Sequence, residues 1–80
     1  MKARVYITLK KGVLDPQGKA TQNALLHLGF SSVDDVRQGK FIELQLTETD
    51  KQKASEAVEK MCKGLLANTV IEDYKYELEA

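Results

Sequence analysis

Side chains that could act as a nucleophile or a general base are scarce in this chain of 80 residues. It contains one histidine, His27, and one cysteine, Cys62. Either would need a neighbouring group to activate and orient it, and the sequence offers no Ser-His-Asp or Cys-His constellation. His27 lies near the expected end of a helix, where the helix dipole favours a cation. Cys62 lies on an apolar stripe, which is typical of a buried and unreactive thiol.

Two pairs of adjacent acidic residues could bind a metal ion or share a proton. They are Asp34 with Asp35, and Glu72 with Asp73. Neighbouring side chains of a strand point to opposite faces of the sheet, so neither pair is well placed to hold one ion. The single histidine and the single cysteine are a poor ligand set for zinc. We therefore expect no catalytic, cofactor-binding or metal site on this chain.

An anion site is a third possibility, in the segment "KKGVLDPQGK" (residues 10–19). It combines three lysines and two glycines at an expected helix start. Helix N-termini can bind anions through their free backbone N–H groups. The segment matches neither G-x-x-x-x-G-K-[S/T] nor G-x-G-x-x-G, so it contains no nucleotide-binding motif. A turn followed by a helix cap explains the segment without a ligand, and we favour that interpretation.

Composition points to protein partners. The 12 basic and 12 acidic residues cancel, which argues against general binding to nucleic acid or to a membrane surface. One domain of this length buries only a thin core, and a lone cysteine cannot form an internal disulfide. We therefore expect oligomerisation to supply the missing stability.

The expected cellular location also follows from the composition of the chain. The chain has no run of 18 apolar residues, so we expect no transmembrane helix. Its N-terminus lacks the apolar stretch of a signal peptide. With a single thiol, it is typical of a cytosolic protein.

The N-terminal third predicts a strand followed by a helix. Residues 4–11 alternate apolar and polar side chains, as a strand does. Asp15 is a good helix cap, and Pro16 suits the first helical position because its missing N–H is not needed there. Gly29 supplies a left-handed stop at the end of the helix.

The rest of the chain predicts two further strands, a second helix and a last strand. Residues 31–46 fit two strands around a turn at Gln38-Gly39, the first of them weak because Val33 and Val36 are out of step. A Thr-x-x-Gln pattern from Thr49 predicts the start of the second helix. Its apolar stripe runs to residue 66, and residues 74–79 alternate again.

The order of elements is therefore β-α-β-β-α-β in one domain, residues 1–80. Its economical packing is α+β: a two-layer, ferredoxin-like arrangement in which two helices cover one face of a four-stranded antiparallel sheet. The last strand should pair with the first. Residues 1–20 hold five basic side chains and one acidic, whereas residues 71–80 hold four acidic and one basic. Opposite charges across paired strands are favourable.

The sheet face without helices would carry Tyr6 and Phe41 among polar groups. Aromatic anchors in a polar surround are typical of an interface, so we predict a homo-oligomer contact here. A solvated face with two scattered aromatic residues is the alternative. Base stacking by the same aromatics would allow RNA binding, but the neutral charge and the acidic last strand count against it.

Two segments carry a family resemblance. "VLDPQGKATQNAL" and "LLANTVIEDYKYEL" resemble the PurS family, and the similarity continues through "VDDVRQGKFIEL" in the middle of the chain. PurS is the small subunit of the multi-chain phosphoribosylformylglycinamidine synthase of purine biosynthesis. The resemblance implies a required but non-catalytic subunit of a glutamine-dependent ligase.

The resemblance also implies the partners. A PurQ-type glutaminase subunit releases ammonia, and a PurL-type synthetase subunit binds ATP and Mg²⁺ and converts formylglycinamide ribonucleotide to formylglycinamidine ribonucleotide. The small subunit joins the two as a homodimer or a higher homo-oligomer and holds no cofactor itself. The alternative is an ACT-like regulatory domain that binds an amino acid at a dimer interface, because such domains share the order of elements and a similar turn.

The two specific segments are the candidate partner interface, although both could also be no more than caps and turns. The predicted fold places them at opposite ends of the sheet, so we do not expect them in a single patch. The residues are Leu14, Asp15, Pro16, Gln17, Gly18, Asn68, Thr69, Ile71, Glu72, Asp73 and Tyr74.

Overall fold

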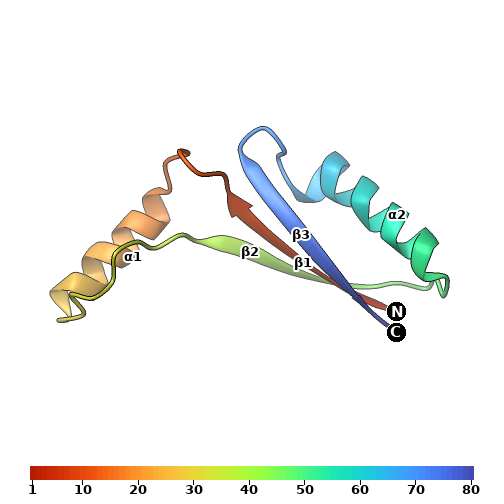
Figure 1. Ribbon diagram of the computed structural model, residues 1–80, viewed down its shortest axis with the longest axis horizontal. Coiled ribbons are helices and arrows are strands. Elements are labelled where there is room, and N and C mark those ends of the chain that lie inside the picture. Colours follow the sequence, from red (N-terminus) through yellow and green to blue (C-terminus); the bar gives the residue numbers. More distant parts are fainter.

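A computed structural model describes all residues, 1–80 (Figure 1). Its elements follow in chain order: strand β1 (Lys2–Leu9), helix α1 (Pro16–His27), strand β2 (Gly39–Gln45), helix α2 (Lys51–Met61), a short π-helical segment η1 (Cys62–Leu66) and strand β3 (Glu72–Glu79). Neither α-helix has the length and apolar character of a membrane span.

The sheet is antiparallel, with β1 in the centre and the strand order β2-β1-β3. The predicted pairing of the first strand with the last is confirmed, with Lys2 opposite Glu79 and Leu9 opposite Glu72. The predicted charge complementarity is also present, because the Arg4 guanidinium lies 2.6 Å from the Glu79 carboxylate.

The prediction of a four-stranded ferredoxin-like sheet is wrong, because the sheet has three strands. Residues 31–38 are not a strand, and no hairpin turn forms at Gln38-Gly39, since β2 begins at Gly39. Side chains of other segments form hydrogen bonds with some backbone groups of residues 31–38. Gln22 donates to the carbonyl oxygen of Asp34, and the Gln38 N–H donates to Asp15. The segment runs along α1 instead of along the sheet.

The predicted position of α1 on the sheet is also wrong. Only α2 covers the sheet, while α1 and residues 31–38 project beyond β2 as an arm (Figure 1). The Cα radius of gyration is 16.0 Å, whereas a compact chain of this length has about 12 Å. The chain by itself is therefore extended, in contrast to the two-layer sandwich of an ACT-like domain.

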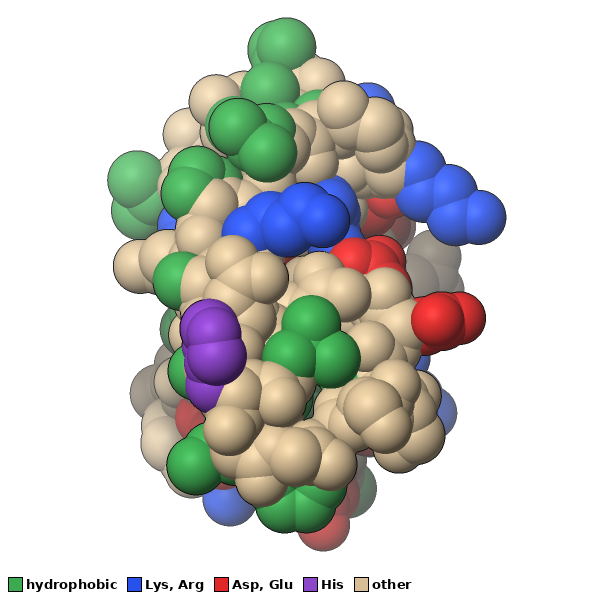
Figure 2. Space-filling view, turned by 90° about the vertical axis from the view of Figure 1, so that its left-hand side faces the viewer, with side chains coloured by type: hydrophobic (Ala, Val, Ile, Leu, Met, Phe, Trp, Pro, Cys, Tyr) green, Lys and Arg blue, Asp and Glu red, His purple; other side chains and the backbone are tan.

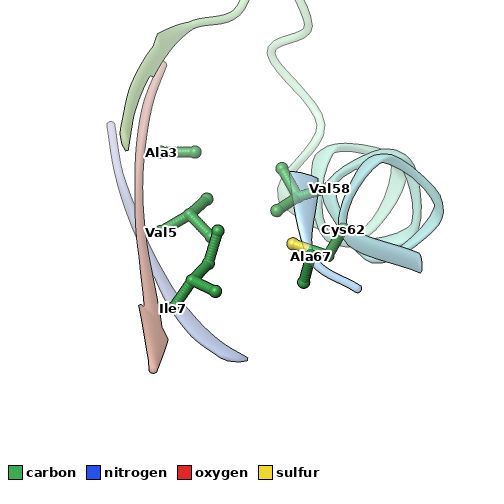
Figure 3. Packing of buried hydrophobic residues seen from close by; sticks show 6 residues of the cluster. All are labelled: Ala3, Val5, Ile7, Val58, Cys62 and Ala67. Atoms are coloured by element: carbon green, nitrogen blue, oxygen red, sulfur yellow. The ribbon is translucent and has the colours of Figure 1, made fainter. Parts of the chain in front are cut away.

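The core lies between the central strand and α2. Ala3, Val5 and Ile7 of β1 face Val58, Cys62 and Ala67 across one narrow layer (Figure 3). Only 9 of 80 residues are buried, and Gly18 is the only one of them in the arm. A core this small leaves the arm dependent on contacts outside the single chain.

Helix ends follow local chemistry. Asp15 caps α1 with Pro16 in the first turn, and Gly29 has a φ of 99°, as predicted. The cap of α2 is Asp50, one residue after the predicted Thr49, and its carboxylate accepts from the N–H groups of Gln52 and Lys53.

Candidate functional site

The two specific segments meet at one end of the sheet, so our expectation that they lie at opposite ends is wrong. The chain leaves β1 after Leu9, and β3 starts at Glu72, directly opposite Leu9 in the antiparallel pair. The N–H of Lys10 donates to the carbonyl oxygen of Ile71 at 2.8 Å. An antiparallel partner begins where its neighbour ends, which is why both junctions share this end of the sheet. We call it the junction end.

Asp15 connects two parts of the junction end. Its side chain is buried, with one carboxylate oxygen 2.8 Å from the N–H of Gly18 and the other 2.7 Å from the N–H of Gln38. These two hydrogen bonds, first that from Gly18, hold the pKa of Asp15 below its usual range, and the nearby charge of Arg37 acts in the same direction. The carboxylate therefore ties the start of α1 to the start of β2 and fixes the direction in which the arm leaves the sheet.

Gly18 is required for this connection because there is no room for a side chain. A Cβ atom at Gly18 would collide with the carbonyl oxygen of Val36 and lie 2.9 Å from the carboxylate of Asp15. The last two residues of "LDPQG" thus differ in role: Gln17 is exposed, whereas Gly18 is buried against the returning chain.

The second segment closes a tight turn. The carbonyl oxygen of Asn68 accepts from the N–H groups of Ile71 and Glu72, and its side chain accepts from Val70. The Glu72 side chain accepts from the Asn68 N–H at 2.7 Å and lies 3.7 Å from the ammonium of Lys40. Thr69 lies exposed in the turn. The asparagine therefore shapes the turn after η1, and Glu72 joins that turn to β2.

A small cavity of about 160 Å³ opens between the two segments. Residues of both segments line it together with residues at the start of β2, and they include Asp15, Gln17, Glu72, Gln38 and Lys40. Every buried side-chain nitrogen or oxygen atom of the protein has a hydrogen-bond partner. No group of three or more His, Cys, Asp or Glu side chains is arranged to hold a metal ion.

Exposed apolar side chains lie in the segments that form the junction end. Leu65 at the end of η1 is 85% exposed and Val70 in the following turn is 81% exposed, while Leu14 and Ile71 are also open to solvent. Pro16, two residues after Leu14, is exposed as well. We call Leu14, Leu65, Val70 and Ile71 the apolar junction surface. Exposed apolar groups rimmed by polar ones are typical of a protein interface.

Asp73 and Tyr74 point to opposite faces of β3. Asp73 is exposed on the face without helices, whereas Tyr74 is half-buried toward α2. The Tyr74 hydroxyl donates to the Glu59 carboxylate at 2.6 Å, and this bond raises the pKa of Tyr74 to about 12. Tyr74 therefore fastens β3 to α2, and its contact with a partner stays a prediction.

The Tyr74 bond makes stability depend on pH in the alkaline range. Because the pKa is raised in the folded state, its stabilising effect is complete below pH 10 and is lost as pH rises from 10 to about 12. We expect Tyr74→Phe to have a lower free energy of unfolding than the parent at pH 8. Between pH 10 and 11.5 the free energy of unfolding should fall less for the variant than for the parent. Urea unfolding at several pH values measures both. If the free energy of unfolding changes with pH in the same way for both proteins, the hydroxyl does not make this bond.

A family model described as phosphoribosylformylglycinamidine (FGAM) synthase, PurS, matches residues 2–80. This chain belongs to the PurS family. It is 51% identical to the FGAM synthase subunit PurS of Bacillus subtilis over 98% of this chain and 92% of the relative. It is 49% identical to the PurS subunit of Methanocaldococcus jannaschii, over 98% and 94% of the two chains. The resemblance found in the sequence is confirmed.

Solved structures of PurS proteins share the fold. B. subtilis PurS superposes with a TM-score of 0.88 at 51% identity, covering 99% of this chain and 98% of that one. The PurS-like chain in a structure of PurLQS from Thermotoga maritima superposes with a TM-score of 0.87 at 33% identity, covering 95% and 93%. The three-stranded sheet with a projecting arm is therefore shared with solved members of the PurS family.

The two residues predicted for the homo-oligomer contact, Tyr6 and Phe41, lie on the sheet face that no helix covers. The rings of Tyr6 and Phe41 are 5.2 Å apart, and the Lys75 ammonium lies 5.3 Å from the Tyr6 ring centre. An ion pair between Lys2 and Glu43 borders them. Charged groups thus surround the aromatic pair, and its role in a homo-oligomer contact stays a prediction.

The cysteine and the histidine, the two candidate reactive side chains, lie where the sequence predicted them. Cys62 is fully buried, and burial, with the nearby Glu59, raises the pKa of its thiol. His27 is exposed at the end of α1. Sequence reasoning missed Gln38, Glu59, Leu65 and Val70. Leu65 and Val70 are apolar residues within the specific segment "LLANTVIEDYKYEL", which was a usable signal, whereas the partners of Asp15 and Tyr74 depend on tertiary contacts.

Proposed function

We propose that this chain is the small, non-catalytic subunit of a phosphoribosylformylglycinamidine synthase, a glutamine-dependent ligase of purine biosynthesis. The observation that carries the proposal is the match along nearly the whole chain to PurS subunits of FGAM synthase, among them the chain of the PurLQS structure. In this proposal its partners are a PurL-type synthetase, which uses ATP and Mg²⁺, and a PurQ-type glutaminase, and it acts in the cytoplasm.

The junction end is the part we assign to partner binding. It brings both specific segments together, its backbone is held by Asp15 and Glu72, and it exposes the apolar junction surface. A pre-organised surface with apolar anchors loses little conformational entropy on binding. The residues predicted from sequence supply mainly the framework, and Leu65 and Val70 supply the largest exposed contacts.

The mechanism follows from geometry and not from a reactive group on this chain. Ammonia released by a glutaminase must reach the synthetase before it escapes into water. A small subunit that binds both enzymes, itself a homodimer or higher homo-oligomer, raises their effective concentration and fixes their relative orientation. The chain holds no cofactor in this scheme.

Reconstitution tests the proposal. We expect the synthetase and glutaminase to form product from glutamine at a rate at least about 10-fold higher when this chain is present, as effective-concentration effects predict. Product formation from formylglycinamide ribonucleotide, ATP and glutamine is the measurement, with and without the chain. Equal rates in both mixtures would refute the scaffold role.

A further inference from the structure

Strand β3 forms a free edge of the sheet. It pairs with β1 on one side and has no strand on the other, and it lies on the side of the sheet away from the arm (Figure 1). Its 8 residues stay in register with β1 without a bulge or a proline, whereas natural proteins often use such features to block an edge. Its one lysine, Lys75, extends over the Tyr6 ring of the central strand. The edge of β3 is therefore available for pairing with another strand.

Three residues of β3 direct their backbone groups away from β1. The N–H of Lys10 donates to the carbonyl oxygen of Ile71, and this pair continues the register of the two strands. Hydrogen-bonded and non-bonded pairs alternate in an antiparallel ladder, so the odd-numbered residues of β3 are the ones that bond to β1. The N–H and carbonyl groups of Tyr74, Tyr76 and Leu78 therefore face the free edge, where a further strand could bond to them.

A pocket on the α2 side of this edge has room for the side chains of an added strand. Its volume is about 540 Å³, and it is lined by Lys51, Gln52 and Ser55 of α2 and by Tyr76 and Leu78 of β3. The hydroxyl groups of Ser55 and Tyr76 are 2.7 Å apart and join the two walls. Tyr76 and Leu78 are also two of the residues with free backbone groups. A strand that bonds to them would direct every second side chain toward this pocket.

The opposite face of β3 is acidic. It carries three carboxylates and one ammonium group, and Asp73 and Glu77 are exposed there without an ion pair. Opposite charges on neighbouring strands are favourable and like charges are unfavourable, so a basic strand fits this edge better than the β3 of a second copy does. The end of the molecule that carries the arm shows basic and acidic side chains close together (Figure 2), so charge does not select one kind of partner there.

We propose that the free edge of β3 binds an extended segment of another protein that carries lysine or arginine at alternate positions. The segment pairs antiparallel with β3, and the backbone groups of Tyr74, Tyr76 and Leu78 supply the hydrogen bonds. Its apolar side chains enter the pocket beside α2, and its cations face Asp73 and Glu77. This inference goes beyond the proposed function, because it assigns a second binding surface and does not depend on which protein occupies the junction end.

A designed peptide tests the backbone pairing. The probe is the end-capped peptide Lys-Val-Lys-Val-Thr-Val-Lys, which in antiparallel register places its lysines opposite Glu79, Glu77 and Asp73 and its threonine opposite Lys75. Its valines then lie opposite the three residues with free backbone groups and donate to them. We expect N-methylation of the three valines to weaken binding at least about 10-fold, and N-methylation of the three lysines to change it by less than about 3-fold. Isothermal titration calorimetry measures both. Equal affinities for the two methylated peptides, or no binding of the parent peptide, would overturn the proposal.

Hydrogen exchange locates the contact on the chain. When the peptide is bound, the amide protons of Tyr74, Tyr76 and Leu78 should exchange at least about 10-fold more slowly, because they become hydrogen-bonded. The amides of the odd-numbered residues of β3 already bond to β1 and should change by less than about 3-fold. If the first three amides exchange slowly before any peptide is added, a second copy covers the edge and the proposal is wrong.

Neutral substitutions test the choice of a basic segment. We expect Asp73→Asn combined with Glu77→Gln to weaken binding of the parent peptide about 5-fold, because two cross-strand charge pairs are lost. Asp34→Asn combined with Glu56→Gln is the matched control, since it removes the same charge at exposed positions outside β3 and should leave the affinity unchanged. Equal weakening in both variants would show that only the net charge of the chain attracts the peptide.

Discussion

Gly18→Ala is expected to lower the free energy of unfolding by up to about 2 kcal/mol. The new methyl group would collide with the Val36 carbonyl and the Asp15 carboxylate, and the first of these is backbone, which no side-chain rotation can move. Overpacking of this kind costs up to about 3 kcal/mol, and the better helix propensity of alanine returns only about 1 kcal/mol. Urea unfolding at one fixed protein concentration measures the change, since association contributes to the stability.

Gly64→Ala provides the matched control. Gly64 lies in the helical segment η1, and beyond its chain neighbours and the local helix backbone no atom lies within 4 Å of the added Cβ. We therefore expect this variant to be neutral or more stable by up to about 1 kcal/mol. Equal losses in the two variants would mean that helix geometry alone decides the result. No loss at Gly18 would show that the arm is not held by Asp15 and Gln38.

The local elements were predictable, whereas the position of the arm was not. Alternation predicts β1 and β3, and Asp15 before Pro16 predicts where α1 starts, because these patterns depend on neighbours in the sequence. Whether α1 then packs on its own sheet depends on the bond between Asp15 and Gln38, which are 23 residues apart. The irregular spacing of Val33 and Val36 already argued against a strand. The strand was nevertheless predicted because the expected fold has four strands.

The candidate site was likewise predictable in its local segments but not in their arrangement in space. Both specific segments were identified from the sequence, but their common location requires the antiparallel pairing of β1 with β3 to be followed to its end, where Lys10 meets Ile71. Tyr74 looked like a contact residue, although its place in the alternation also puts it on the core side with Tyr76. Exposure decides which apolar residues are available for docking, and a sequence does not contain it.

The largest functional effect is expected from two charges on the apolar junction surface. In the reconstituted enzyme, Leu65→Asp combined with Val70→Asp should raise the concentration of this chain needed for half-maximal glutamine-dependent activity at least about 100-fold, because interface anchors of this size each contribute about 1–2 kcal/mol or more. Both side chains are more than 80% exposed, so the isolated chain should keep its fold. A titration of the chain against fixed synthetase and glutaminase gives the shift, and circular dichroism checks the fold.

Thr47→Asp combined with Thr49→Asp adds the same charge at the other end of the sheet. Both threonines are exposed in the loop after β2, which ends beside the start of β1, far from the junction end. We expect this control to follow the parent titration. A binding defect is overcome by mass action, so the Leu65 and Val70 variant should recover full activity at high concentration. An unshifted titration for that variant would exclude the apolar junction surface as the docking site, whereas a lower plateau at every concentration would place its effect after binding.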